Sequence, residues 1–194
     1  MGVVPLSRSF YARDGRVVAP ELLNKLLVRG ERVARIVEVE AYAGAEDPGS
    51  HAYRGRTPRN ATMFGPAGHL YVYFTYGMHF CANVVCGDVG VASAVLLRGL
   101  TALEGLEQMR ALRLKARTDR ELCAGPGRLC QAFGLDRTFD GSDLVTGDRG
   151  VMVVDDGTPP PPEPGVSVRV GLTTGAELPW RYYVPGALGL SRRG

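Results

Sequence analysis

Polar and apolar positions alternate over several stretches of the chain, with the period of two that a half-buried strand requires. Residues 32–43 are rich in β-branched side chains, and residues 69–76 place aromatic side chains on both faces of an extended segment. Both ranges predict strands, as do residues 79–85. Gly77 and Met78 form a tight turn before residues 79–85, which predicts a β-hairpin that protrudes from the sheet.

The period of an amphipathic helix occurs only in short stretches. Helices are predicted for residues 20–28, for residues 103–115 and for a short segment that opens at Gly125-Pro126. Further strands are predicted for residues 91–98, 151–154, 166–172 and 182–184. A few helices among meandering strands favour an α+β fold, a mainly antiparallel curved β-sheet with surrounding helices. The length of 194 residues fits a single domain over residues 1–194.

Composition excludes several classes of protein. Hydrophobic residues make up 45% of the chain and charged residues 22%, as in a globular protein. Glycines, prolines and histidines break the longest uncharged run, residues 61–87, so a bilayer helix is excluded. Residues 1–11 show no secretory signal. We therefore expect a cytoplasmic protein without a membrane partner, associated with the nucleoid if it is bacterial.

The four cysteines do not indicate a metal site. Four residues separate Cys81 from Cys86 and six separate Cys123 from Cys130, so neither pair has the spacing of structural zinc ligands. His79 beside Cys81 is compatible with a metal ligand, but buried, reduced thiols are favoured. We expect neither a metal ion nor another cofactor.

Charge is distributed unevenly, although the net charge is only +3. Residues 48–87 contain no Asp or Glu, yet they hold Arg54, Arg56, Arg59, all three histidines and four tyrosines. Such a segment is attracted to a phosphate backbone and can stack on bases. A polar loop beside a buried aromatic hairpin explains the same pattern, and charge alone leaves both interpretations open.

Glu38 and Glu40 are the candidates for acid–base chemistry. The period of two puts both on one face of the strand over residues 32–43, a face that they share with apolar residues. Tyr42 follows on the same face, and Arg98 and His51 are candidate supports. A catalytic carboxylate must lie partly buried, near a cation and within reach of the attacking oxygen. A salt-bridged strand end is the alternative.

Several motifs occur in register from about Leu22 to Ser191. They are residues 37–42 (VEVEAY), His51, residues 56–60 (RTPRN) with Met63 and Phe64, residues 70–83 (LYVYFTYGMHFCAN), residues 95–98 (VLLR), residues 125–132 (GPGRLCQA), and residues 169–171 (RVG) with residues 181–184 (RYYV). Together they resemble the 3-methyladenine (alkyladenine) DNA glycosylase family. Each motif is modest alone, but their common order over nearly the whole chain is specific.

The resemblance implies a monofunctional base-excision enzyme that acts on double-stranded DNA containing damaged purines. Such an enzyme flips an alkylated or deaminated purine into a pocket and hydrolyses its N-glycosidic bond. By position, Glu40 corresponds to the general base that holds the attacking water, and Arg98 assists it. Neither Lys25 nor Lys115 lies near the motifs, so a Schiff-base lyase step is not expected. The protein is expected to be a monomer.

The resemblance also assigns roles in binding. Tyr42 and Tyr73 correspond to the aromatic walls of the base pocket, His51 to its edge, and Asn83 to the residue that crowds the amine of guanine. Tyr76 corresponds to the side chain that intercalates where the nucleotide left. Contacts with the DNA backbone are assigned to Arg56, Arg59, Met78 and Arg128. Pro185 stands where many relatives have a basic residue, so one phosphate contact is expected to be missing or moved.

Two other functions compete with this interpretation. A non-catalytic nucleic-acid-binding module on the same fold would not need Glu40, Tyr42, His51 and Arg98 together. A sugar-directed glycosidase would use Glu38 and Glu40 as its carboxylate pair. Side chains two residues apart on a strand point in parallel, whereas that pair must flank the scissile bond, so the geometry disfavours a glycosidase.

Overall fold

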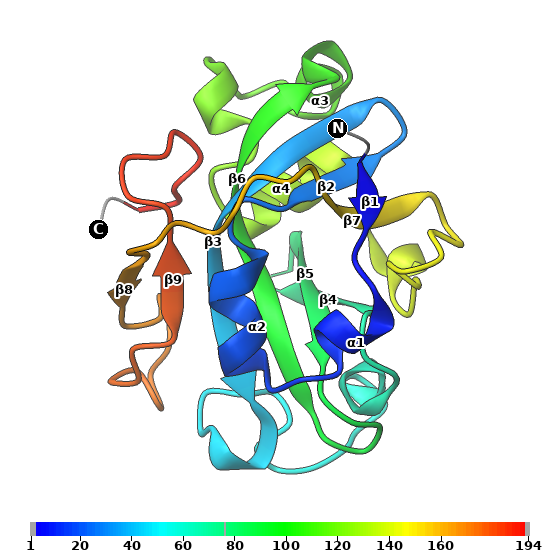
Figure 1. Ribbon diagram of the computed structural model, residues 1–194, viewed down its shortest axis with the longest axis vertical. Helices are drawn as coiled ribbons and strands as arrows, with labels where there is room; N and C mark the ends of the chain where they lie inside the picture. Colours follow the sequence, from blue (N-terminus) through cyan, green and yellow to red (C-terminus); the bar gives the residue numbers. More distant parts are fainter. Residues whose placement is uncertain (1–2, 76, 193–194) are drawn as a thin grey trace.

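The computed structural model describes residues 3–75 and 77–192. In this part of the chain nine strands form one sheet in which every pairing is antiparallel, and the main path runs β1-β7-β2-β3-β6-β5-β4 (Figure 1). The strands are β1 (Val4–Pro5), β2 (Leu26–Arg29), β3 (Arg32–Ala43), β4 (Leu70–Thr75), β5 (His79–Cys86), β6 (Ser93–Glu104), β7 (Val151–Asp155), β8 (Gly165–Ser167) and β9 (Arg181–Tyr183). The predicted α+β fold with a curved antiparallel sheet is confirmed.

The helices are short and lie around this sheet (Figure 1). They are α1 (Arg8–Tyr11), α2 (Gly15–Leu22), α3 (Leu106–Leu112) and α4 (Pro126–Phe133), with 3-10 turns at Gly44–Glu46, Ala61–Phe64, Asp119–Glu121 and Arg137–Phe139. Among the described residues, no helix combines the length and the apolar character that crossing a bilayer requires.

The sheet separates two apolar clusters, because alternate side chains of its strands point to opposite faces. The main core holds Leu70 and Val72 of β4 together with side chains of α2 and α4. A smaller cluster on the other face holds Tyr71, Val85, Ala94 and Met63, with Tyr73 packed against it. This smaller cluster, called the second cluster below, forms the floor of the candidate site.

Strand β3 has two different neighbours along one edge. Its first half pairs with β2, from Leu26–Arg35 to Arg29–Arg32, and its second half pairs with β9, from Glu38–Tyr183 to Glu40–Arg181. The other edge pairs with β6 along nearly its whole length. The change of neighbour occurs at Glu38, so the acidic end of β3 lies between β6 and β9.

Two β-bulges at the same place change the face on which the glutamates lie. Ile36 pairs with Leu100, Glu38 with Gly99 and Val39 with Leu97, so Val37 is an extra residue on β3 and Arg98 is one on β6. A bulge redirects the side chains that follow it. Ile36 and Val39 both join the main core, and Glu38 and Glu40 therefore leave the face that strict alternation assigns to them. The expectation that they share a face with apolar residues such as Ile36 is wrong.

Several predicted elements differ from those observed. The helix predicted for residues 20–28 is wrong: α2 ends at Leu22 with Pro20 in its last turn, and Asn24 has a left-handed backbone (φ 68°). Leu26–Arg29 is a strand because it completes the ladder between β3 and β7. Strand β6 extends to Glu104, and α3 begins only after Gly105, whose φ of 67° ends the strand. Strand β8 covers only Gly165–Ser167.

Strands β4 and β5 pair from Leu70–Val84 to Thr75–His79. The segment that joins them contains Tyr76, which lies outside the described residues. The expectation that this hairpin protrudes stays a prediction.

Candidate active site

A pocket opens beside the second cluster, where the ends of β3, β4 and β5 meet the loop over residues 44–60. About 340 Å³ of space free of atoms lies within its outline, a volume that includes open solvent. Its lining residues are Tyr42, Gly49, His51, Met63, Tyr71, Tyr73, Asn83 and Leu172. The four residues that the sequence assigned to a base pocket, Tyr42, His51, Tyr73 and Asn83, therefore line one cavity.

Three aromatic rings form one side of the pocket. The ring of His51 meets that of Tyr73 edge to face, with centroids 4.5 Å apart and an interplanar angle of 76°. The ring centroids of Tyr71 and Tyr73 are 5.4 Å apart, and the Tyr71 hydroxyl lies 3.3 Å from Nδ1 of His51. Although His51 as a residue is exposed, desolvation of its ring, and then the charge of Arg59, lower its pKa. The imidazole is thus neutral at neutral pH and adds no charge to the pocket.

Asn83 is buried in β5, and its Nδ2 donates to the backbone carbonyl of Tyr71 at 3.2 Å. This bond uses one amide hydrogen and fixes the side chain against the pocket floor. The amide oxygen and the second amide hydrogen stay available to a ligand, because an Asn side chain carries two donors and two acceptor lone pairs.

Glu40 lies directly behind the pocket and is not part of its lining. Its side chain is fully buried, whereas a partly buried carboxylate was expected. Oε1 accepts a hydrogen bond from the backbone N–H of Val170 at 2.8 Å, and Oε2 accepts one from the hydroxyl of Tyr42 at 3.0 Å. The Tyr42 hydroxyl thus stands between this carboxylate and the pocket.

Burial raises the pKa of Glu40 above its ordinary value. The charge of Arg98, the Val170 N–H and the Tyr42 hydroxyl oppose this shift, and the nearby Glu38 adds to it. Burial also raises the pKa of Tyr42, so its hydroxyl keeps its proton and donates to Glu40. Glu40 is therefore a carboxyl group in a desolvated site next to a cation.

Arg98 brings the two glutamates together. Its Nε lies 3.2 Å from Oε1 of Glu38 and 3.4 Å from Oε1 of Glu40, and its side chain is 11% exposed. Glu38 has other partners: Nε of Arg181 at 2.7 Å, and both the N–H (2.6 Å) and the hydroxyl (2.9 Å) of Ser191. Both carboxylates thus contact one guanidinium. The carboxylate oxygens of Glu38 also accept hydrogen bonds from Arg181 and Ser191 in the C-terminal segment.

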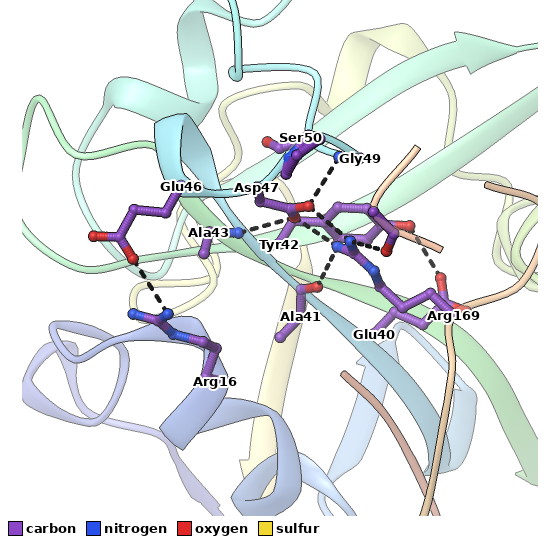
Figure 2. Close-up of polar contacts among 12 residues, drawn as sticks. Arg16, Glu40, Ala41, Tyr42, Ala43, Glu46, Asp47, Gly49, Ser50 and Arg169 are labelled. Atoms are coloured by element: carbon purple, nitrogen blue, oxygen red, sulfur yellow. Dashed lines mark hydrogen bonds and ion pairs between the residues drawn. The ribbon is translucent and has the colours of Figure 1, made fainter. Parts of the chain in front are cut away.

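A buried ion pair packs behind Tyr42. Arg169 and Asp47 have fully buried side chains and meet through two contacts, Nη1–Oδ2 at 2.5 Å and Nη2–Oδ1 at 2.7 Å. The guanidinium also donates to the carbonyl of Ala41 and lies over the ring of Tyr42, 4.6 Å from its centroid (Figure 2). Asp47 accepts from the N–H groups of Ala43 and Gly49, which ties the pocket loop to the end of β3.

The residues assigned to DNA contacts lie at the surface. Arg56, Arg59, Met78 and Arg128 are all exposed. Arg59 adjoins the pocket, since its guanidinium lies 5.7 Å from the centroid of the Tyr73 ring. Arg128 extends from the first turn of α4, whose N-terminus is the positive end of the helix dipole. Tyr76, the predicted intercalating residue, lies outside the described residues.

Sequence reasoning missed part of the site. It did not assign Met63, Tyr71 or Leu172 to the pocket, nor the ion pair of Asp47 with Arg169. The alternation along β4 contained the signal for Tyr71, because it places Tyr71 and Tyr73 on one face. No sequence pattern joins Asp47 to Arg169, which are 122 residues apart.

The described residues contain no group of three or more His, Cys, Asp and Glu side chains that could hold a metal ion. All four cysteines are buried and none forms a disulfide. Burial raises the pKa of Cys81, the cysteine nearest Tyr73 in the β4–β5 ladder. These thiols are therefore protonated side chains that pack in the fold.

Comparison of the whole chain with known proteins gives one family. The family model described as methylpurine-DNA glycosylase (MPG) matches residues 9–188. A protein of Burkholderia lata named "Putative 3-methyladenine DNA glycosylase" is 56% identical over 182 residues, which cover 93% of this chain and 88% of that protein. Proteins of the same name from Streptomyces avermitilis (51% over 189 residues; 93% and 87%) and Carboxydothermus hydrogenoformans (46% over 184 residues; 92% and 94%) are also similar.

Proposed function

The chain belongs to the methylpurine-DNA glycosylase family, and on that premise we propose that it releases alkylated or deaminated purines from double-stranded DNA by hydrolysis. The observation that carries the proposal is the position of Glu40, a buried carboxylate beside Arg98 and directly behind an aromatic pocket. Water, a carboxylate and a site for the base are the components that cleavage of an N-glycosidic bond needs.

In the proposed reaction, Glu40 accepts a proton from a water molecule as the oxygen of that water attacks the anomeric carbon of the sugar. The bond from this carbon to the purine nitrogen breaks, its electron pair leaves with the base, and positive charge builds up on the sugar. The ionised carboxylate stabilises that charge. Within residues 3–75 and 77–192 the Tyr42 hydroxyl is the one hydrogen-bond partner of Glu40 Oε2, so a lone pair is left for the water.

The base enters the pocket by flipping out of the duplex. Tyr42 and Tyr73 would stack on it, His51 would lie at its edge, and Asn83 would crowd the exocyclic amine of a normal guanine. An aromatic pocket favours alkylated purines that carry a positive charge, because such a ring attracts a cation. Tyr76 would fill the gap in the stack and offset part of the unstacking cost. Exposed Arg56, Arg59, Met78 and Arg128 would bind the DNA backbone.

The proposed enzyme is monofunctional and acts as a single-domain monomer. A lyase step needs an amine next to the sugar. The chain has two lysines: Lys25, just before β2, pairs with Asp155 of β7 at 2.7 Å, and Lys115 follows α3 at the surface. Neither lines the pocket.

The two competing functions account less well for these residues. A module that only binds nucleic acid has no use for a desolvated carboxylate, since burying Glu40 costs free energy without adding a contact to DNA. A sugar-directed glycosidase needs two carboxylates on opposite sides of the scissile bond. Glu38 and Glu40 contact the same guanidinium, and Arg181 and Ser191 occupy Glu38.

The test is base release by Glu40→Gln. This variant keeps the size of the side chain and an acceptor for the Tyr42 hydroxyl, but it cannot take a proton from water. We expect it to bind a duplex containing 1,N6-ethenoadenine, hypoxanthine or 7-methylguanine as the wild type does, and to lower the single-turnover rate of base release by about a hundredfold or more. Abasic sites are counted after strand cleavage at those sites.

Glu46→Gln is the matched control, because Glu46 is an exposed glutamate near the site whose ion-pair partner among the described residues is Arg16 (Figure 2). It should release bases at the wild-type rate. Base release by Glu40→Gln within a few-fold of the wild type would refute the assigned mechanism. A wild-type protein that binds lesion DNA but produces no abasic site would instead favour the non-catalytic module.

A further inference from the structure

Asp47 and Arg169 form an ion pair that the reaction proposed above does not use. Both side chains are fully buried, and neither lines the pocket. Besides Asp47, the guanidinium donates to the carbonyls of Ala41 and Gly175 and lies between the rings of Tyr42 and Trp180, 4.6 and 5.1 Å from their centroids. A cation thus lies against the same tyrosine ring that lines the pocket.

The ring of Tyr42 contacts the Arg169 guanidinium on its interior side and lines the pocket on another side. Because Arg169 is fully buried and is absent from the lining, it covers the part of the ring that faces away from the pocket. A guanidinium over an aromatic face draws electron density toward itself, and its own field extends through the ring. Left alone in a desolvated site, it would repel a second cation on the pocket side.

We propose that Asp47 determines substrate specificity by neutralising Arg169 behind Tyr42, so that the pocket side of this ring still attracts a positively charged purine. This inference rests on the proposed function, since it requires a damaged base against Tyr42. It concerns which bases are favoured, whereas the proposal for Glu40 concerns how the bond breaks. The two can therefore fail separately.

The geometry of the pair supports this role. Both carboxylate oxygens of Asp47 face the two terminal nitrogens of Arg169, so the two charges cancel closely beside the ring. The other charges next to Tyr42 are also paired, because Glu40 accepts from its hydroxyl and lies near Arg98. Asp47 thus balances Arg169, the cation that lies over the ring in the described part of the chain.

Substitutions can remove either charge and keep most of the other contacts. In Asp47→Asn, the amide oxygen can still accept one of the N–H groups of Ala43 and Gly49, but Arg169 is left uncompensated. In Arg169→Gln, Asp47 still accepts from the same two N–H groups, whereas the guanidinium over the Tyr42 ring is removed. The double variant has neither charge. The two single variants should therefore shift specificity in opposite directions.

The measurement is the ratio of single-turnover rates of base release from two duplexes, one with cationic 7-methylguanine and one with neutral 1,N6-ethenoadenine. Relative to the wild type, we expect Asp47→Asn to lower this ratio about threefold or more, Arg169→Gln to raise it, and the double variant to return it to near the wild-type ratio. Thermal unfolding followed by the fluorescence of Trp180, the one tryptophan of the sequence, establishes that each variant is folded.

Asp156→Asn is the matched control, because it leaves Arg35 of β3 without its carboxylate partner at the end of the strand far from the pocket. Its ratio should equal that of the wild type. If Asp47→Asn does not fold, the inference is tested by Arg169→Gln alone, which should raise the ratio of the two rates. The inference is overturned if the folded single variants keep the wild-type ratio, lose both substrates in equal proportion, or shift the ratio in the same direction. Failure of Glu40→Gln to lose activity would refute the mechanism and leave this ratio interpretable.

Discussion

Glu40 combines full burial with a hydrogen bond to Tyr42, a residue that lines the pocket. Burial raises its pKa, whereas Arg98 and the Val170 N–H favour the ionised form. A raised pKa makes the carboxylate a better proton acceptor, because a base of higher pKa gains more from taking a proton. The same shift moves the loss of the ionised form to higher pH.

The acid limb of the pH–rate profile follows from this direction. Base release requires ionised Glu40, so the rate falls as the pH drops through its raised pKa. On 7-methylguanine, which needs no further proton to leave, we expect the half-maximal rate to lie above pH 4.5, the ordinary value for glutamate. Single-turnover rates across the acid range, corrected for base loss without protein, give the midpoint. A midpoint at or below pH 4.5 would contradict the assigned role.

The element that organises the site is the end of β3, where paired bulges direct Glu38 and Glu40 away from the main core. The C-terminal segment covers this point. A side chain at Gly99 would collide with the carbonyl of Gly189 and with Glu38, so both the bulge and the covering segment depend on a residue without a Cβ. Glu38 then fixes the segment through Ser191 and β9 through Arg181.

Glu38→Gln should therefore destabilise this part of the fold. The amide would face donors on Arg181 and Ser191, and breaking a buried charge pair typically costs about 3–5 kcal/mol. For a chain of this length the loss lowers Tm by roughly 6–20 °C. Thermal unfolding measures the shift, with Glu46→Gln as the exposed control that should not change Tm. An unchanged Tm for Glu38→Gln would show that this network adds no net stability.

At the scale of the molecule, one face of the sheet forms the main core and the other face carries the pocket. Helices α2 and α4 pack on the main core, and the pocket opens by the second cluster on the other face. Exposed arginines lie around this arrangement, among them Arg56 and Arg59 in the pocket loop and Arg128 on α4. Since the net charge is only +3, affinity for DNA must come from where these side chains lie.

The salt dependence of binding to undamaged duplex DNA tests this distribution. Each phosphate contact contributes about −0.9 to the slope of log K against log salt concentration. We expect Arg56→Ala and Arg128→Ala each to reduce the steepness of this slope by about 1. Arg13→Ala should leave it unchanged, because both terminal nitrogens of Arg13 already donate to the carboxylate of Glu21. Slopes are measured by fluorescence anisotropy, and an unchanged slope for both variants would place the DNA on another surface.

The sequence by itself determined the strands β3, β4 and β5, the start of α4, the antiparallel α+β class and the family. These features depend on local periodicity, on β-branched and aromatic residues and on short motifs, all of which are properties of neighbouring positions. The family resemblance assigned Tyr42, Tyr73 and His51 to one base pocket, and all three line the same cavity. Roles for Tyr76 and for the protruding hairpin stay predictions, since residue 76 lies outside the described residues.

Only the tertiary structure decided which way Glu38 and Glu40 point and what lies behind Tyr42. A bulge reverses the alternation after it, and no single residue in the VEVEAY segment marks its position. The tertiary structure also decided the conformation of residues 20–28. Their local pattern favours a helix, but Leu26–Arg29 forms a strand because it pairs with β3 and β7. Asp47 and Arg169 are 122 residues apart and meet only when the chain is folded. The preferences of neighbouring residues therefore do not predict this pair.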